Sequence, residues 1–383
     1  MVKPILPKPS QRTIERNWSP GTLCTVPNST NLCVLMDPAQ NLIAVVYFDD
    51  ETLFINLRAL VDDSFHPQAA GPILFLSELP GYDNDVDSES VKLKVMGRHI
   101  ALQLAASNCD TWQLQIWDWQ RSTTSDNVLS GDHPYEVDFC FLRNDRLLVV
   151  ADNLKLYSIE DMSKTPELLA SFVLPVQLPG MTACLLPVDS ITCSSQPQMQ
   201  VQQTMYTPDP KHRLLCITMY TYVSSIVYII STRIFFDLPE IAVATPIPWK
   251  CWGPSNTRIF RCPPEHDECR VHHNGNRVLL LLRVHNSKRK PVWNRKYELC
   301  IMDFSPLAVR NSRGLGQVVT KPSTLNVADL NCKRNSCEER LTTFLPYVKV
   351  VLNRRFGLDD LKNIWMDKDR IYLLSDKLEV IDV

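Results

Sequence analysis

Glycine is scarce in this sequence, at 11 of 383 residues, or about 3% where ~7% is usual. Turns must therefore rely on Asp, Asn and Pro, and proline is plentiful at 27 residues. Long apolar runs are also missing, because the longest, VLLLL at 278–282, is far too short to cross a bilayer. Residues 1–18 contain no apolar core of a signal peptide. The sequence therefore predicts neither a membrane span nor a secretion signal.

An excess of charge of one sign is missing too. The 40 basic and 42 acidic residues give a formal net charge of −2, which supplies no general positive field for nucleic acid or an anionic membrane. We therefore expect no nucleic-acid or membrane partner. The 13 cysteines are an odd number, and most lie in apolar runs, as small buried hydrophobes do in a reducing compartment. This pattern predicts a cytoplasmic or nuclear protein. Examples are Cys33, Cys140, Cys216 and Cys300.

Recognisable catalytic motifs are absent from the sequence. It contains no Gly-x-Ser-x-Gly elbow, no His-Glu-x-x-His, no P-loop and no Gly-x-Gly-x-x-Gly after a strand. Acidic residues and histidines occur without recognisable pairings. The sequence therefore predicts no catalytic residue and no cofactor, and we do not expect an enzyme.

One segment, CPPEHDECRVHH, is rich in metal-ligand residue types. It contains Cys262, His266, Cys269, His272 and His273. Structural zinc sites usually pair ligands two to four residues apart, and the two cysteines are too far apart for this. The adjacent histidines would point to opposite faces of a strand. The spacing favours a polar loop and predicts no metal site, although metal binding stays open as the alternative.

An irregular repeat runs through the chain. Six times, a polar turn leads into a β-rich apolar run, which is followed by a second strand-like segment and preceded by a candidate strand. The apolar runs begin at Leu42, Ile100, Leu147, Leu214, Val278 and Ile371. Three short strands joined by tight polar turns form an antiparallel meander. The sequence thus predicts at least six meanders.

Six meanders can pack as a β-propeller or as stacked sandwiches, and their repetition favours the propeller, which protects sheet edges. Successive runs start 47 to 93 residues apart, unlike WD repeats of about 40–45 residues. Long loops must therefore interrupt the units, and the last interval has room for a further unit or a helical insert. We predict an all-β fold, an irregular β-propeller-like array of six or seven antiparallel meanders with long loops.

The domain organisation follows from the same pattern. Residues 1–19 are predicted to be an N-terminal extension, and residues 20–383 a single domain. Closure of a propeller usually needs the terminal strands to share one unit. The candidate pair is GTLCTVPNSTNLCVLM at 21–36 and LEVIDV at 378–383. A capping-box pattern at 336–339 predicts a short helix.

Five tryptophans are candidate structural anchors. In LQIWDWQ, strand alternation places Trp117 and Trp119 on one face and Asp118 on the other. Trp365 is the candidate anchor of the last unit. We expect Trp117 and Trp119 to hold the blade together and to touch no ligand, so they do not identify a binding face.

The remaining two anchors lie in IPWKCWGPSNTRIF (247–260). Trp249 and Trp252 are expected to be buried anchors of a connector that turns at Gly253 and Pro254. Proline-rich connectors such as ATPIPWKCWGP are predicted to be extended, because proline blocks strand continuation.

The segment 247–260 also resembles a Trp-x-x-Trp-Gly-Pro-x-x-Thr-Arg element in the C-terminal region of a large family of fungal F-box proteins. Four later stretches resemble that family's closing sequence in the same order. They are IMDFSPLAVR (301–310), VVTKPSTLN (318–326), LPYVKVV (345–351) and WMDKDRIYLLSDKLEVID (365–382). DPAQNLIAVV and LQIWDWQ resemble its early strands. The resemblance covers roughly residues 20–383 and implies a β-propeller-like recognition domain.

The chain departs from this family in one respect. F-box proteins have a helical module of about forty residues near the N-terminus, and no such module is visible here. The resemblance therefore implies a substrate-recognition fold but does not carry over the adaptor role. The linker subunit of a ubiquitin ligase is an expected partner only if the full-length protein contains an F-box.

These observations predict a protein–protein interaction domain that resembles the receptor part of F-box ubiquitin-ligase adaptors. The alternative is a propeller-type enzyme or small-molecule binder with a site in the central channel, because propellers can assemble sites from distant units. Recognition residues of propellers lie on loops whose identity the fold does not constrain. The sequence therefore predicts a protein partner without indicating the binding face.

Overall fold

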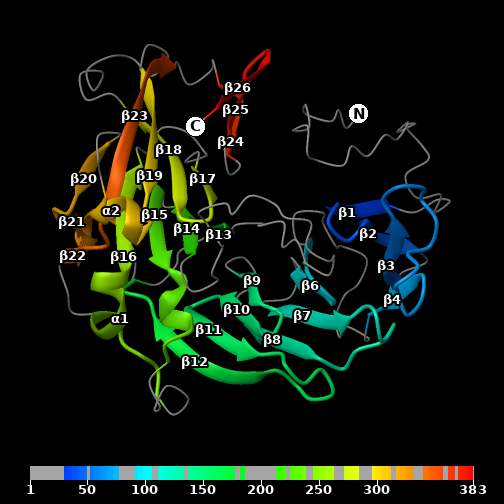
Figure 1. Ribbon diagram of the computed structural model, residues 1–383. Coiled ribbons are helices and arrows are strands. Elements are labelled where there is room, and N and C mark those ends of the chain that lie inside the picture. The colour runs from blue at the N-terminus through cyan, green and yellow to red at the C-terminus, as the bar shows by residue number, and fades with distance from the viewer. Residues whose placement is uncertain are drawn as a thin grey trace.

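The computed structural model describes residues 30–49, 52–76, 91–105, 111–132, 137–176, 182–185, 213–220, 225–238, 245–262, 271–283, 296–311, 316–330, 340–356, 361–366 and 370–382. These residues form an all-β structure of antiparallel sheets with few helices (Figure 1). Six of the sheets, numbered here in chain order, are the main units, and a separate two-stranded hairpin accompanies them.

The first three sheets are simple four-stranded meanders. Sheet 1 contains β1 (Thr30–Asp37), β2 (Leu42–Asp49), β3 (Thr52–Ala59) and β4 (Ile73–Phe75), paired in that order. Sheet 2 contains β5 (Val91–Met96), β6 (His99–Ala105), β7 (Thr111–Asp118) and β8 (Val128–Asp132). Sheet 3 contains β9 (Asp138–Arg143), β10 (Arg146–Val150), β11 (Asn153–Ser158) and β12 (Glu167–Val173).

The last three sheets are less regular. Sheet 4 contains β13 (Thr182–Leu185), β14 (Leu214–Tyr220), β15 (Ser225–Ser231) and β16 (Thr257–Cys262). Sheet 5 contains, in pairing order, β17 (Val271–Asn274), β18 (Arg277–Arg283), β19 (Tyr297–Asp303), β23 (Tyr347–Phe356) and β20 (Gln317–Val319). Sheet 6 contains β24 (Asn363–Met366), β25 (Arg370–Leu374) and β26 (Leu378–Asp382).

The other elements lie in the connections. They are the 3-10 helices η4 (Thr232–Phe235) and η7 (Val327–Leu330), the helices α1 (Trp249–Asn256) and α2 (Pro306–Arg310), and the hairpin of β21 (Ser323–Asn326) and β22 (Arg340–Thr343). No helix in the described ranges is long and apolar enough to cross a bilayer.

Each pair of consecutive sheets shares one apolar cluster. Members contributed by the two sheets are Ile55 and Leu102 for sheets 1 and 2, Ile116 and Phe139 for sheets 2 and 3, Leu154 and Leu215 for sheets 3 and 4, Ile229 and Leu280 for sheets 4 and 5, and Leu299 and Ile371 for sheets 5 and 6. Strands in the middle of such an array are covered on both faces, which explains why their sequences are continuous apolar runs without alternation. All seven residues of β6 are buried.

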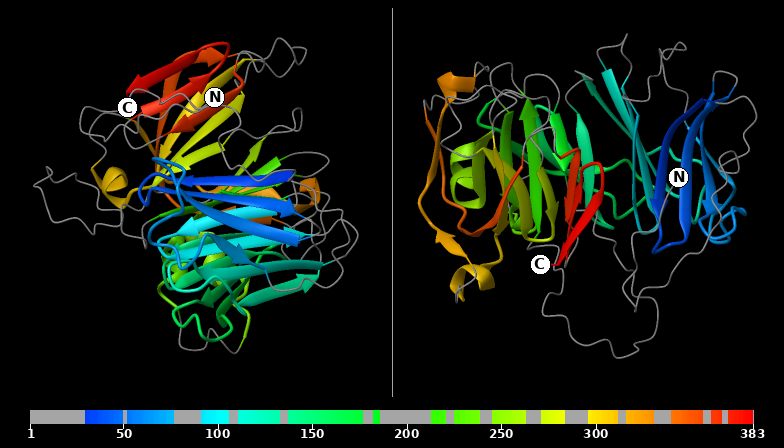
Figure 2. Two further views of the ribbon diagram at one scale, coloured as in Figure 1. Left: turned by 90° about the vertical axis from the view of Figure 1, so that its right-hand side faces the viewer. Right: turned by 90° about the horizontal axis from the view of Figure 1, so that it is seen from above.

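The six sheets follow one another along an arc (Figures 1 and 2). The first strands of neighbouring sheets lie side by side, because β1 contacts β5, β5 contacts β9, and β9 contacts β13. At the far end of the arc, β17 contacts β24. These first strands are therefore the inner strands, and sheets 1 and 6 lie at the two ends of the array.

The predicted runs coincide with the second strands of the sheets, and the segments after them with the third strands. The prediction of three strands per unit was too low for sheets 1 to 5, which have four or five strands. The additional strands were missed because outer strands are only partly buried and lack a strong apolar pattern. β8, for example, has no fully buried residue.

Turn chemistry agrees with the low glycine content. Gly97 and Gly275 adopt positive φ in the tight turns before β6 and β18, and Asn41 adopts the same conformation before β2. Asparagine tolerates this left-handed region better than most residues. Polar residues thus replace glycine at some of the turns.

The described residues of the long last interval form no complete further unit. β23 returns to sheet 5 beside β19, β20 pairs with β23, and β21 and β22 form a separate two-stranded sheet. The predicted terminal pair is not formed by the described strands either, since β1 belongs to sheet 1 and β26 to sheet 6. Residues 21–29 of that pair, the helix predicted at 336–339 and the proposed boundary at residue 19 lie outside the described residues.

The connector at α1 differs from the prediction. It was expected to be extended and to turn at Gly253 and Pro254, but both residues lie inside the helix. The segment just before the helix is extended at Ile247, which forms a parallel bridge to Phe172 of β12. Packing of the two tryptophans outweighs the poor helix propensity of proline and glycine, as tertiary contacts often do.

Candidate functional site

Trp117 and Trp119 are fully buried between sheets 1 and 2. The indole nitrogen of Trp117 donates to the carbonyl of Phe75 at 3.2 Å, and that of Trp119 donates to Gly97 at 3.0 Å. The ring of His66 meets Trp119 edge-on at 4.8 Å. Because their polar atoms are already engaged, these two tryptophans join sheets and offer nothing to a ligand.

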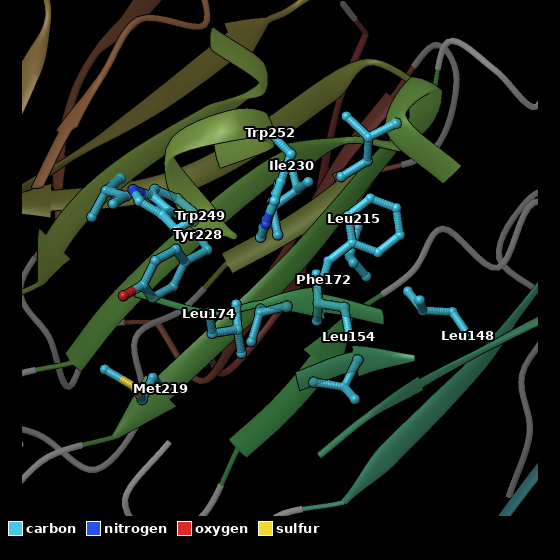
Figure 3. Close-up of a cluster of buried hydrophobic side chains, with 14 of the residues drawn as sticks. Leu148, Leu154, Phe172, Leu174, Leu215, Met219, Tyr228, Ile230, Trp249 and Trp252 are labelled. Carbon is cyan, nitrogen blue, oxygen red and sulfur yellow. The ribbon is translucent and has the colours of Figure 1, made fainter. Parts of the chain in front are cut away.

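Trp249 and Trp252 of α1 lie in the cluster between sheets 3 and 4 (Figure 3). Their rings meet edge-on with centroids 4.8 Å apart, and Trp252 packs in the same way on Phe172 at 5.7 Å. The indole nitrogen of Trp252 donates to the carbonyl of Val173 at 3.2 Å. Trp249 packs edge-on against Tyr228 of β15 at 6.4 Å. The two side chains therefore bind α1 to both sheets.

Gly253 is required by this packing. A Cβ atom at this position would lie 2.3 Å from ring carbons of Trp249, which is closer than real Cβ contacts allow. The glycine of the Trp-x-x-Trp-Gly-Pro pattern thus makes room for the tryptophan and does not serve as a turn.

Arg258, two residues after α1, is 3% exposed. Its guanidinium donates to the carbonyls of Lys321 and Leu345, and it lies 5.1 Å from the ring centroid of Tyr347. Burial lowers the pKa of Arg258 below its usual value, while Tyr347 raises it. The arginine therefore connects β16 to two segments that are distant in the sequence.

Backbone hydrogen bonds also hold these segments together, and the place where Arg258 joins them is called the junction. The amide of Phe344 donates to Pro254 at 2.8 Å, and that of Leu345 donates to Thr257 at 3.2 Å. Three of the segments on which the family resemblance was based, 247–260, 318–326 and 345–351, therefore meet at one place. These contacts give the three segments a structural role and say nothing of a ligand.

Replacing Arg258 by methionine should lower the free energy of unfolding by about 2 kcal/mol, because it leaves two carbonyls without their charged donor. Urea unfolding would measure this. Arg261→Met on the same strand is the matched control, since Arg261 is exposed, and it should change the free energy by less than about 0.5 kcal/mol. Equal effects of the two substitutions would contradict the role of the junction.

Trp365 differs from the other four anchors because it is 36% exposed. Ile364, Met366, Ile371 and Leu373 of sheet 6 face sheet 5, so strand alternation puts Trp365 on the opposite face. There it stands directly across from Tyr372, which stands across from Val380. These three residues, together with Leu374 and its partner Leu378, are called the end face.

The end face is open. Leu378 is 42% exposed and Val380 is 40% exposed, while Tyr372 and Leu374 are half-buried. Charges around it are paired within the chain, as Arg354 with Glu379 and Arg370 with Asp382. The surface is thus apolar, with little unpaired charge.

Sequence reasoning named Trp365 but missed the rest of the end face. The sequence LEVID predicts a strand, whose side chains alternate between two faces. Which of the two faces has no neighbouring sheet among the described residues depends on the position of sheet 6 at the end of the array, and no local pattern encodes that position.

The alternative function, an enzyme or small-molecule binder with a site in the central channel, would need polar side chains on the inner strands that are available to a ligand. Lys94 of β5 donates to the carboxylate of Asp138 on β9 at 2.8 Å and also to the carbonyl of Phe139. Lys92 donates to the carbonyl of Val137 at 2.7 Å. These lysines join neighbouring inner strands, so their hydrogen bonds are used within the fold.

The segment CPPEHDECRVHH, which is rich in metal-ligand residue types, is distributed over two strands and the undescribed residues between them. Cys262 ends β16, and His272 and His273 lie in β17, whereas His266 and Cys269 are outside the described residues. His272 accepts a hydrogen bond from the amide of Met366 at 3.1 Å, and burial lowers its pKa. Within the described part of the chain, no group of three or more His, Cys, Asp or Glu residues is placed to hold a metal.

Comparison with known proteins gives no family. No family model and no curated protein matches the chain, so the resemblance to fungal F-box proteins has no support beyond the segments themselves. Among solved structures, the chain is similar to the WD40 domain of SCAP from fission yeast, at 10% identity over 86% of this chain and 75% of that chain, with a TM-score of 0.36. It is also similar to a prolyl endopeptidase, at 9% identity over 93% of this chain and 40% of that chain, with a TM-score of 0.41. At these TM-scores neither likeness supports an inference about function.

Proposed function

We propose that this chain is a protein-binding domain of the β-propeller type and that it binds its partner through the end face. The observation that carries the proposal is the open row of Trp365, Tyr372 and Val380 on a sheet whose other face packs Ile364, Met366, Ile371 and Leu373 against sheet 5. Aromatic side chains in apolar patches are typical centres of protein interfaces.

The architecture supports a propeller-type arrangement. Consecutive four-stranded antiparallel meanders share apolar clusters, and their first strands adjoin one another along the arc. Radial repetition of such meanders defines a propeller. In this proposal the chain is not an enzyme, it has no cofactor, and it acts in the cytoplasm or nucleus, where its buried cysteines stay reduced.

Trp365→Ser should weaken partner binding at least thirtyfold, because a central tryptophan often contributes about 2 kcal/mol or more. The partner would be captured by a photo-crosslinking residue placed at Tyr372 and identified by mass spectrometry, and its affinity would then be measured by titration. Leu168→Ser on β12 is the matched control, since Leu168 is also 36% exposed, and it should leave the affinity unchanged. Equal affinities of the Trp365 variant and the unaltered chain would reject the end face as the docking surface.

A finer role, as the substrate receptor of a ubiquitin-ligase adaptor, rests on the sequence resemblance alone. Affinity purification of the tagged chain from its native cells tests it by scoring the linker subunit and cullin. Recovery of both near stoichiometry would support this role. Enrichment of another protein without them would leave protein binding as the function and reject the adaptor role.

A further inference from the structure

The hairpin between β17 and β18 contains the one Asn-Gly step of the sequence. Asn274 ends β17, Gly275 and Asn276 form a two-residue turn, and Arg277 begins β18. Every other asparagine is followed by a residue with a side chain. Asparagine is a chemically labile residue, and a following glycine has no Cβ atom to keep its backbone nitrogen away from the asparagine side chain. The turn therefore places two groups that can react with each other next to each other.

Neither of these groups is held by a hydrogen bond. Among the described residues, the side-chain amide of Asn274 has no hydrogen-bond partner, and the backbone amide of Gly275 donates to none. Gly275 has a φ of +56°, and a Cβ atom at this position would meet no atom within 4 Å. Both residues are half-buried, so water reaches the turn. The Asn274 side chain is thus free to rotate towards the Gly275 nitrogen.

Asn276, in the same turn, has a different environment. Its carbonyl accepts a hydrogen bond from the amide of Phe304 at 2.8 Å. The residue that follows it, Arg277, pairs with Asp303 at 3.2 Å and with a strand partner. The peptide after Asn276 is therefore fixed, and its nitrogen belongs to a residue with a bulky side chain.

We propose that Asn274 is a site of spontaneous deamidation. The backbone nitrogen of Gly275 loses its proton to hydroxide and attacks Cγ of Asn274, which forms a new carbon–nitrogen bond. The bond from Cγ to the side-chain nitrogen breaks, and that nitrogen takes up a proton and leaves as ammonia. Water then opens the resulting succinimide ring at either carbonyl, which gives aspartate or isoaspartate. The reaction consumes one water, releases one ammonia and needs no oxidant or reductant.

The isoaspartate product also changes the contact between sheets 5 and 6. It inserts a methylene group into the main chain at the end of β17, where Asn274 pairs with Arg277. Two residues earlier in this strand, His272 accepts a hydrogen bond from the amide of Met366 at 3.1 Å. Because β17 and β24 are neighbours, a longer main chain at the end of β17 should weaken this hydrogen bond.

Ageing of the purified full chain at mildly alkaline pH tests the proposal. Peptide mass spectrometry, with fragmentation that separates aspartate from isoaspartate, would follow the conversion. We expect Asn274 to convert at least about tenfold faster than Asn276, and the rate to rise with pH because the attacking nitrogen must lose its proton. Equal rates at the two asparagines, or an intact Asn274, would overturn the proposal.

Two variants provide matched controls. Asn274→Gln keeps an amide but requires a six-membered ring, so it should give no product at this position. Gly275→Ala places a Cβ atom in open space and should slow the conversion of Asn274 about tenfold. Circular dichroism checks that each variant is folded. Conversion of Asn274 at an unchanged rate in folded Gly275→Ala would exclude attack by the Gly275 nitrogen.

Hydrogen exchange measures the effect on sheet 6. The Met366 amide should exchange faster in the aged protein than in the fresh protein, and at the same rate in fresh and aged Asn274→Gln. Equal exchange in fresh protein and in protein that carries isoaspartate would overturn the proposed effect on the contact between the sheets. The inference does not depend on the proposed function, because its readouts are chemical conversion and exchange and involve no partner.

Discussion

Replacing Trp252 with alanine is expected to lower the free energy of unfolding by about 4 kcal/mol. The side chain is 3% exposed, packs on Phe172 and Trp249, and donates to the carbonyl of Val173. Removing it leaves a cavity between sheets 3 and 4 and takes the donor from a main-chain acceptor, and both changes destabilise the folded state.

Chemical unfolding measured by tryptophan fluorescence and circular dichroism would give this value. Trp365→Ala is the matched control because it truncates the same side chain at a site that is 36% exposed, and it should cost about 1 kcal/mol. Equal destabilisation by the two substitutions would show that Trp252 does not anchor α1 to sheets 3 and 4 as its packing indicates.

Acid sensitivity is the second large expected effect. His99 of β6 is fully buried between sheets 2 and 3, and among the described residues neither of its ring nitrogens has a hydrogen-bond partner. Its ring stacks on Phe141 of β9 at 6.4 Å. The pKa of His99 is lowered to about 4, chiefly by burial; the positive charges of Arg98 and Arg121 also lower it, and Asp118 partly offsets them.

The sign of the effect follows from linkage. An unfolded histidine binds a proton below about pH 6.5, whereas the folded state resists protonation until about pH 4. The contribution to stability is therefore complete above pH 6.5 and is lost as the pH falls to about 4. A shift of this size corresponds to about 3 kcal/mol.

His99→Phe removes the proton-binding group and keeps an aromatic ring against Phe141. We expect the free energy of unfolding of this variant to fall by about 3 kcal/mol less between pH 7 and pH 4 than that of the unaltered chain. His66→Gln is the control, since the ring of His66 has partners in Gln40 and Gln68. Parallel pH profiles for all three proteins would contradict the assignment of acid sensitivity to His99.

Much of the architecture was predictable from local sequence. The six apolar runs marked the second strands, and the segments after them marked the third strands, because strands covered on both faces need nearly continuous apolar residues. Adjacent His272 and His273 were correctly expected to lie on a strand. The outer strands escaped prediction because they are only partly buried and their pattern is weak.

The connector at α1 shows where local reasoning failed. Its proline and glycine predicted an extended segment with a turn, yet the segment forms a helix in which Gly253 contacts the ring of Trp249. The helix exists because sheets 3 and 4 provide a site for both tryptophans. Propensity is a weak bias of less than about 1 kcal/mol for most residues, and burying two indoles outweighs it.

The candidate docking surface depended even more on tertiary structure. The sequence marked Trp365 as an anchor, but it cannot show that no sheet of the described residues covers this face of sheet 6. By itself, the sequence determined the strand content, the meander repeat and the buried runs, because these depend on neighbouring residues. Only the tertiary structure decided which faces and edges stay open, because these depend on how sheets far apart in the chain are placed.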